Sequence, residues 1–161
     1  MKLRHLFFAC SGVFVMMFSL LLLVVIVFSD EEDGGSGGNL IYGGVSVSQE
    51  VLAHKPMLEK YAREYGIEEY LNVLLAIIQV ESGGTLEDVM QSSESLGLPP
   101  NSLSTEESIK QGCKYFSELL AAAETKGCDL NSVIQSYNYG GVFLDYVAGR
   151  GKKYTFELAE S

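Results

Sequence analysis

The chain has 161 residues, enough for one globular domain, and it is acidic, with 11 Lys and Arg residues against 21 Asp and Glu residues. Lys2 and Arg4 precede Asp30, so from Asp30 onward nine basic residues face all 21 acidic ones, a formal balance of −12. This charge excludes a nucleic-acid-binding domain of the usual basic kind. It also argues against electrostatic adhesion to an anionic surface.

Residues 6–28 form an apolar run without a charged residue, and a helix of about 20 apolar residues spans the hydrocarbon core of a membrane. Basic residues precede the run and acidic residues follow it, so the positive-inside bias places the N-terminus in the cytoplasm. A cleaved signal peptide is the alternative, but the run exceeds the usual apolar region of about 7–15 residues and no A-x-A-like site follows. We therefore predict an uncleaved, single-pass signal-anchor over residues 1–29.

Residues 30–47 are rich in Gly, Ser and acidic residues and offer little apolar surface to bury. This composition predicts a flexible linker between the membrane and a folded domain. The domain is expected over residues 48–161, a length sufficient for one hydrophobic core.

The pattern of this domain is helical, and no convincing strand pair is visible. We predict helices from Pro56 to Gly66, from about Glu68 to Glu81, from Ser104 through about Thr125, from Asp129 through about Tyr137, from Phe143 to Ala148, and from Tyr154 onward. The second of these is apolar on nearly all sides, which is typical of a central helix covered by others. The expected fold class is therefore all-α, with a buried central helix that Gly83 and Gly84 terminate.

Glu81 is the last residue of that central helix. The negative end of the helix dipole disfavours an ionised carboxylate there, and the apolar neighbours Ile77, Ile78 and Val80 add desolvation. Both effects raise a carboxyl pKa, as a general acid working near neutral pH requires. The alternative is an exposed glutamate in the last turn of a helix that serves solubility only.

Three more acidic residues, Glu87, Asp88 and Glu94, follow the glycine break. A single raised glutamate suits glycoside cleavage, in which it protonates the leaving oxygen, and a hydrolase normally adds a second carboxylate. The sequence does not predict their distances from Glu81, and a solvated loop is the alternative.

The segment "QSYNYGG", residues 135–141, places aromatic rings on both sides of an amide just before a helix end. Stacking faces and a hydrogen-bonding amide suit a sugar ligand. The alternative is a helix end with tyrosines packed in the core.

Two cysteines, Cys113 and Cys128, fall in the part expected outside the cell, where a disulfide is permitted. Their spacing does not decide between a disulfide and two buried thiols. His54 has no companion ligand nearby, so we predict no metal site and no cofactor.

Three segments, "VESGG", "DVMQSSES" and "SYNYGG", stand in one order over predicted helices. Together they resemble the lysozyme-like domains of the goose-type lysozyme and soluble lytic transglycosylase superfamily. The segment "DVMQSSESLG" resembles more closely the muramidase domain of CwlT-type hydrolases, membrane-anchored cell-wall enzymes of conjugative elements. The resemblance covers residues from about 48 to 158.

The resemblance implies an N-acetylmuramidase that cuts the β-1,4 bond between N-acetylmuramic acid and N-acetylglucosamine in peptidoglycan, on the cell-wall side of the membrane. Glu81 matches the general acid, and Asp88 matches the second carboxylate of the CwlT-like muramidases. The residues that match the saccharide-binding segments are Met90, Gln91, Ser92, Ser93, Glu94, Ser95, Tyr137, Asn138, Tyr139 and Gly140.

Asp88 also marks a departure, because transglycosylases have a glycine there, and this departure favours hydrolysis over transglycosylation. The alternatives are a lytic transglycosylase, or a non-catalytic component of a conjugation channel that binds the cell wall. CwlT-type enzymes usually continue into a peptidase domain. Whether this chain is a fragment of such a protein or acts with one domain stays open.

Overall fold

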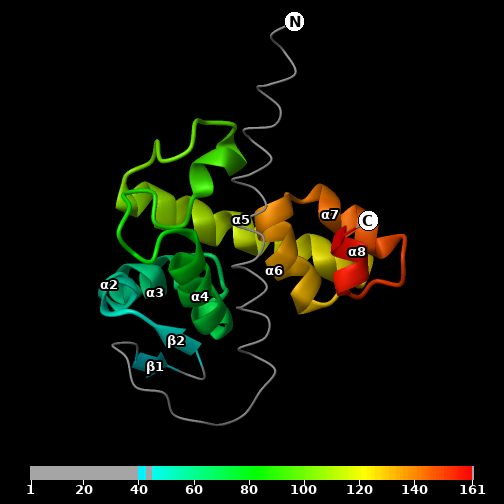
Figure 1. Ribbon diagram of the computed structural model, residues 1–161, viewed down its shortest axis with the longest axis horizontal. Coiled ribbons are helices and arrows are strands. Elements are labelled where there is room, and N and C mark those ends of the chain that lie inside the picture. Colours follow the sequence, from blue (N-terminus) through cyan, green and yellow to red (C-terminus); the bar gives the residue numbers. More distant parts are fainter. Residues whose placement is uncertain (1–39, 43–44, 161) are drawn as a thin grey trace, which may run out of the picture.

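The computed structural model of the protein describes residues 40–42 and 45–160, and these are mostly helical (Figure 1). The elements, labelled as in Figure 1, are the strands β1 (Leu40–Tyr42) and β2 (Val45–Val47), the helices α2 (Gln49–Ala53), α3 (Lys55–Glu64), α4 (Leu71–Glu81), α5 (Thr105–Lys126), α6 (Leu130–Tyr139), α7 (Val142–Ala148) and α8 (Phe156–Glu160), and the 3₁₀ turns η1 (Glu68–Tyr70) and η2 (Ser92–Leu96).

The central helix is α4, which η1 leads into and which packs against β2, α2 and α3. Six consecutive residues, 73–78, are buried, so no side of this stretch faces solvent. The helix ends before Gly83 and Gly84, both of which have positive φ angles, 61° and 79°. The prediction of a buried central helix that ends at Glu81 is confirmed.

Helix α5 runs across the molecule, with α2, α3 and α4 toward one side and α6, α7 and α8 toward the other (Figure 1). It begins where predicted, because the Glu107 carboxylate accepts hydrogen bonds from both the amide and the hydroxyl of Ser104. It ends at Gly127, whose φ of 72° suits a left-handed helix cap. Its buried face carries Phe116 and joins the two sides into one core.

The structure differs from the prediction at the start of the fold, because β1 and β2 form an antiparallel pair inside the segment predicted to be a flexible linker. Leu40 pairs with Val47, which is fully buried, and β2 packs against α4. The expectation of no strand pair was therefore wrong. The glycine-rich composition hid short apolar stretches on either side of Gly43 and Gly44, a spacing typical of a two-residue hairpin connection.

The predicted signal-anchor, including residues 6–28, lies outside the described residues. Within residues 40–42 and 45–160, no helix has both the length and the apolar character that a membrane span requires.

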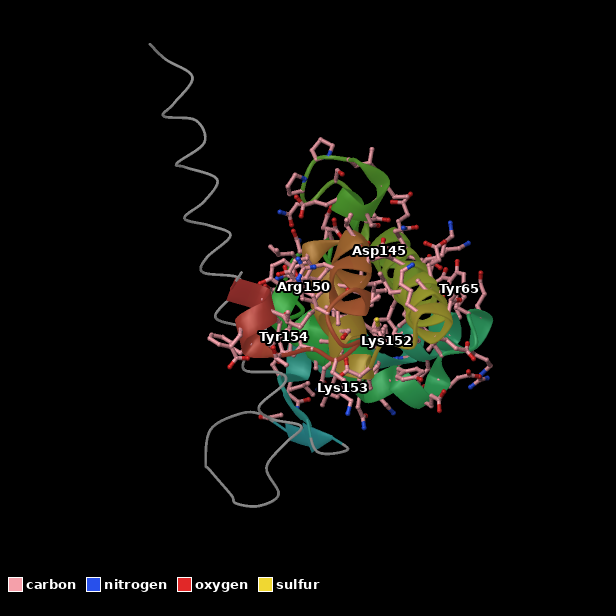
Figure 2. All side chains as sticks on the ribbon, turned by 90° about the vertical axis from the view of Figure 1, so that its right-hand side faces the viewer. Tyr65, Asp145, Arg150, Lys152, Lys153 and Tyr154 are labelled. Carbon is pink, nitrogen blue, oxygen red and sulfur yellow. The ribbon has the colours of Figure 1, made fainter. Side chains whose placement is uncertain are left out.

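The C-terminal elements close the far end of the fold. Figure 2 shows Asp145 on α7 with Arg150, Lys152 and Lys153 in the turn that follows. Asp145 pairs with Lys126 at the end of α5, with a nitrogen–oxygen distance of 3.0 Å. The carbonyl of Lys152 accepts a hydrogen bond of 3.2 Å from the amide of Asp129, which caps α6. These bonds connect the end of α5 to α7 and the start of α6 to the turn after α7.

Candidate active site

The end of α4 is held by local and long-range bonds that fix where Glu81 lies. Ser82 donates a hydrogen bond of 2.7 Å to the carbonyl of Val89, which brings the next segment back against the helix end. The amide of Gly84 donates to the Ser82 hydroxyl at 3.0 Å. A Cβ atom on Gly84 would lie 2.7 Å from backbone atoms of Glu50 and Val51, so only glycine allows α2 to pack this closely behind Glu81.

A cleft of about 260 Å³ opens in front of Glu81, and we call it the Glu81 cleft. It lies between the end of α4, the turn η2, one side of α5 and the end of α6. Its lining consists of Glu81, Gln91, Ser92, Glu94, Ser95, Tyr115, Tyr137, Asn138, Tyr139 and Gly140. The three segments that the sequence singled out therefore meet in one cavity.

Glu81 is largely buried at one side of this cleft, and burial raises the pKa of its carboxyl group from the usual 4.5 to about 7. The negative charges of Glu94 and then Asp88 act in the same direction. No Lys or Arg lines the cleft among the described residues, so no cation opposes this rise. Glu81 can thus hold a proton near neutral pH, which is the state that a general acid needs.

Asp88 lies behind the cleft and is fully buried. Its carboxylate accepts hydrogen bonds from the amides of Ser92 and Ser93, at 2.9 and 3.2 Å, and from the hydroxyl of Ser108 on α5, at 2.6 Å. Asp88 therefore caps the turn η2 and ties it to α5, and its side chain does not reach the cleft surface.

Met90 is also buried behind the cleft, and its carbonyl accepts a hydrogen bond of 3.1 Å from the Tyr137 hydroxyl on α6. A Cβ atom on Gly112 of α5 would lie 2.5 Å from the Met90 sulfur and 2.8 Å from the Tyr137 oxygen. The small residue at position 112 thus allows α5, α6 and the segment after the glycine break to converge.

Gln91 has a left-handed backbone conformation with φ of 48°, which is uncommon for a residue other than glycine. Its side-chain amide donates to the Asp88 carbonyl and to the Asn101 side chain, both at 2.8 Å. The conformation directs η2 along the edge of the cleft, and strain of this kind is frequent at functional sites.

Tyr115 lines the cleft but was not among the predicted site residues. Its ring lies 5.5 Å from the Tyr137 ring, measured between centroids. The helical spacing from Ser108 and Gly112 places Tyr115 near the same face of α5, and this periodicity was the available signal. Nothing in the sequence alone showed that this face meets α6.

Nine of the predicted site residues line the cleft, namely Glu81, Gln91, Ser92, Glu94, Ser95, Tyr137, Asn138, Tyr139 and Gly140. Three others, Asp88, Met90 and Ser93, are buried behind it. Their chemical roles stay predictions. Cys113 and Cys128 are both free thiols in the structure. Over residues 40–42 and 45–160, no group of three or more His, Cys, Asp and Glu side chains is arranged to hold a metal ion.

Comparison with known proteins gives one family. A family model described as lysozyme-like matches residues 48–161. Among curated proteins, the chain is 44% identical to the bifunctional muramidase/DL-endopeptidase CwlT of Bacillus subtilis over 119 residues, which cover 73% of this chain and 35% of that protein. It is 39% identical to the uncharacterized membrane protein YocA of the same species, over 71% of this chain and 51% of that protein.

A pneumococcal vaccine antigen A homolog of Streptococcus pyogenes is 41% identical, over 69% of this chain and 56% of that protein. Among solved structures, a Staphylococcus aureus protein described as similar to lipoprotein, NLP/P60 family, superposes with a TM-score of 0.71 and 76% identity. That match covers 72% of this chain and 39% of the solved chain. The chain thus spans between about a third and just over half of the length of these relatives.

Proposed function

The chain belongs to the lysozyme-like family, and on that premise we propose that it is a peptidoglycan glycan-strand hydrolase, an N-acetylmuramidase. The bond it cleaves is the β-1,4 bond between N-acetylmuramic acid and N-acetylglucosamine. One relative, 44% identical, is named a muramidase, which supports this substrate class.

The observation that carries the proposal is the position of Glu81. A carboxyl group whose pKa is raised to about 7 faces a cleft with hydroxyl, amide and aromatic groups. Protonated Glu81 donates its proton to the bridging oxygen as the bond to the anomeric carbon breaks. This role requires no metal ion and no cofactor.

The other cleft residues bind the sugars. Asn138 offers its side-chain amide and Gln91 its side-chain carbonyl oxygen to the N-acetyl and hydroxyl groups, and the rings of Tyr115 and Tyr139 offer apolar faces to the sugar rings. A hydrolase also needs a second acidic group, for which the resemblance implies Asp88. Asp88 is buried behind the cleft, where its carboxylate is hydrogen-bonded to Ser92, Ser93 and Ser108.

Analysis of the products tests the function directly. Purified peptidoglycan digested by the full chain is expected to yield fragments with a reducing N-acetylmuramic acid end, identified by mass spectrometry after borohydride reduction. Fragments with a 1,6-anhydro end would identify a lytic transglycosylase instead. Binding to the wall without any new ends would identify a non-catalytic wall-binding module.

We also propose that residues 6–28 anchor the chain in the cell membrane, with the N-terminus in the cytoplasm and residues 48–161 on the wall side. The apolar run and its flanking charges support this orientation, and the relative YocA is named a membrane protein. Protease added to intact protoplasts should digest the domain. Protection of the domain from the protease would contradict the orientation.

A role in local wall opening for conjugation or secretion rests on the resemblance to CwlT-type hydrolases. If it holds, an inactive Glu81→Gln protein should fail to restore transfer of the conjugative element in a strain that lacks this chain. If that variant restored transfer, hydrolysis by this chain would not be needed for conjugation and the proposed role would be excluded.

A further inference from the structure

Positive charge gathers at one corner of this acidic chain. Of the nine basic residues after Asp30, four lie at the end of α5 and in the turn that follows α7, namely Lys126, Arg150, Lys152 and Lys153. The last three are exposed to solvent and are labelled in Figure 2, and we call them the basic turn. This corner therefore departs from the negative charge of the domain as a whole.

The cations of the basic turn are not neutralised by an acidic side chain. The four lysines on α3 and the first half of α5 each pair with a glutamate, but within the part of the chain that the structure describes no salt bridge involves the basic turn. Two acids of this corner are already engaged. Asp145 pairs with Lys126, and the Asp129 carboxylate accepts hydrogen bonds from Ser132 and from the amide of Tyr154. The basic turn thus keeps its charge for an external anion.

Backbone hydrogen bonds hold the basic turn in one conformation. The amides of Arg150 and Lys152 both donate to the Val147 carbonyl, at 2.9 and 3.0 Å. The Lys152 carbonyl accepts a hydrogen bond of 3.2 Å from the Asp129 amide. Lys152 has a φ of 67°, a left-handed conformation that is uncommon for a residue other than glycine. Because the turn is already ordered, an anion that binds it costs little backbone entropy.

A row of aromatic rings connects the basic turn to the Glu81 cleft. The Arg150 guanidinium lies 3.7 Å from the centroid of the Tyr146 ring and donates a hydrogen bond of 3.3 Å to the Tyr146 carbonyl. The Tyr146 ring stacks on Phe143 and the Phe143 ring on Tyr139, with centroid distances of 6.0 and 4.9 Å. Tyr139 in turn lines the cleft. The basic turn is therefore joined to the cleft by successive ring contacts, within reach of a polymer that extends out of the cleft.

The cleft itself offers no positive charge to an anionic substrate. It contains the carboxyl groups of Glu81 and Glu94, and among the described residues no Lys or Arg lines it. Peptidoglycan carries negative charge, because the peptide stems on its N-acetylmuramic acid residues bear free carboxylates. An acidic domain that binds a strand with stems therefore gains from unpaired cations placed just outside the cleft.

We propose that the basic turn is a binding site for the carboxylates of the peptide stems that the glycan strand carries. This inference deepens the proposed hydrolase function and rests on it. Arg150, held against Tyr146, donates through the edge of its guanidinium to a carboxylate, and the two lysines add charge that salt screens. A stem carboxylate is favoured over other anions of the wall because it belongs to the strand that occupies the cleft, to which the row of rings connects the turn.

Co-sedimentation of the full chain with purified walls tests the site without hydrolysis. Every arm carries Glu81→Gln so that the walls stay intact, and hydrofluoric acid removes phosphodiester polymers from the walls. Arg150→Gln/Lys152→Gln/Lys153→Gln, the basic-turn variant, is expected to bind about tenfold more weakly, because three exposed ion pairs are lost.

The matched control is Arg63→Gln/Lys110→Gln/Lys114→Gln. It removes the same charge from exposed residues of α3 and α5, and it should bind as tightly as the parent chain. Equal binding by the basic-turn variant and this control would overturn the inference.

Chemical changes to the walls identify the anion. Coupling of the stem carboxylates to glycine ethyl ester with a carbodiimide removes their charge and keeps the stems, so the parent chain and the basic-turn variant should then bind equally well. An undiminished difference on these walls would exclude the stem carboxylates. A difference that appears only on walls that keep their phosphodiester polymers would assign the basic turn to a phosphate polymer and overturn the inference.

Kinetics with Glu81 intact connect the site to the reaction. On soluble strands with stems, the basic-turn variant should raise KM about tenfold over the control and leave kcat unchanged, because the turn binds the strand away from the bond that breaks. High salt should bring the two KM values together. A lower kcat at unchanged KM would overturn the binding role. If the wild-type chain releases no reducing ends, the proposed function fails, whereas co-sedimentation still tests the basic turn.

Discussion

The Glu81 cleft and a second hollow on the molecule differ in size and in chemistry. The second hollow, which we call the α5 groove, has a volume of about 500 Å³ against about 260 Å³ for the cleft. It is lined by Tyr65, Gly66, Ile67, Glu69, Tyr70, Ser117, Leu120, Ala121, Ala123, Glu124, Cys128, Leu130 and Val133, and Tyr65 is labelled in Figure 2. Both hollows contain two glutamates.

The glutamates of the groove, Glu69 and Glu124, are both exposed, whereas Glu81 is largely buried at the end of an apolar helix. Water stabilises the charge of an exposed carboxylate, and burial removes that stabilisation. The smaller cavity therefore holds a largely buried carboxyl group, and the larger one does not qualify as an active site on volume alone. The cleft differs from the groove in that one of its two carboxyl groups, that of Glu81, is largely buried while the other, that of Glu94, is exposed.

The largest difference in hydrolysis rate should appear between two variants that each remove one carboxyl group, one from the cleft and one from the groove. Glu81→Gln is expected to lower the release of reducing ends by about 10²–10⁴-fold, because the proton donor is lost. Glu124→Gln in the α5 groove should leave the rate unchanged. If Glu81→Gln kept a rate within tenfold of the wild-type rate, the cleft would have no stronger claim than the groove to be the site of hydrolysis.

The pH dependence of the wild-type chain should follow the Glu81 proton. The acid must be protonated to act and its pKa is about 7, so kcat/KM should fall about tenfold for each pH unit well above 7. The measurement is the initial rate at low substrate concentration from pH 5 to pH 9. An activity that is flat up to pH 9 would exclude Glu81 as the proton donor.

Two glycines with positive φ angles provide a matched pair for the backbone. Gly84 behind the cleft has no room for a Cβ atom, because Glu50 and Val51 backbone atoms would lie 2.7 Å from it, whereas Gly66 in the groove has nothing within 4 Å. Gly66→Ala should cost about 1–2 kcal/mol from the left-handed conformation alone. Gly84→Ala should cost about 2–5 kcal/mol, because overpacking adds to that strain.

Urea unfolding measures both free energies. Gly84→Ala should also lower activity in the folded molecules, since α2 must move away from the helix end that carries Glu81. Equal losses of unfolding free energy in the two variants would show that the close approach of α2 at Gly84 adds nothing to the cost of the substitution.

The raised pKa of Glu81 should make the folded chain less stable as the pH rises. Below the unfolded pKa of about 4.5 the residue is protonated in both states, and above about 7 the folded state must hold a charge that burial disfavours. Glu81→Gln should therefore stabilise the fold by about 1–3 kcal/mol at pH 8 and by almost nothing at pH 4. Thermal unfolding of the wild-type chain and Glu81→Gln at the two pH values measures this difference, and an equal effect at both would contradict the raised pKa.

The smallest effect on hydrolysis is expected from chemical modification of the cysteine thiols. Burial raises the pKa of Cys113 to about 12, and burial is also the main cause of the raised pKa of Cys128, which lines the groove. Cys128 should react slowly with a thiol reagent in the native state and Cys113 only after unfolding. Labelling of Cys128 should leave hydrolysis unchanged. Rapid labelling of Cys113 would contradict its burial, and absence of labelling at both Cys113 and Cys128 after unfolding would indicate a disulfide between them.

Features that depend on neighbours in sequence were predictable. The apolar pattern of residues 71–80 and the two glycines after Ser82 predicted a central helix that ends at Glu81. Ser104 and Glu107 predicted the start of α5, and Gly127 its end. The strands β1 and β2 were missed, because three-residue strands contain too little alternation to stand out from a glycine-rich segment.

The candidate site was predictable as a set of segments but not as an arrangement of side chains. Asp88 and Glu94 follow the same glycine break, and local rules do not say which of them is buried. The bond from Ser108 to Asp88 joins residues 20 positions apart, and the bond from Tyr137 to Met90 joins residues 47 positions apart. Tyr115 was not predicted as a cleft residue for the same reason, since its position depends on how α5 meets α6.

The sequence by itself determined that a buried helix ends in a carboxyl group. The order of apolar residues predicts the helix and its burial, and the glycines after it predict where it ends. Only the tertiary structure decided which other acid lines the cleft together with that carboxyl group. Asp88 turns inward because two amides and one hydroxyl from separate elements converge on it, and Glu94 is left facing the cleft. Such convergence depends on contacts between distant parts of the chain, which no local pattern specifies.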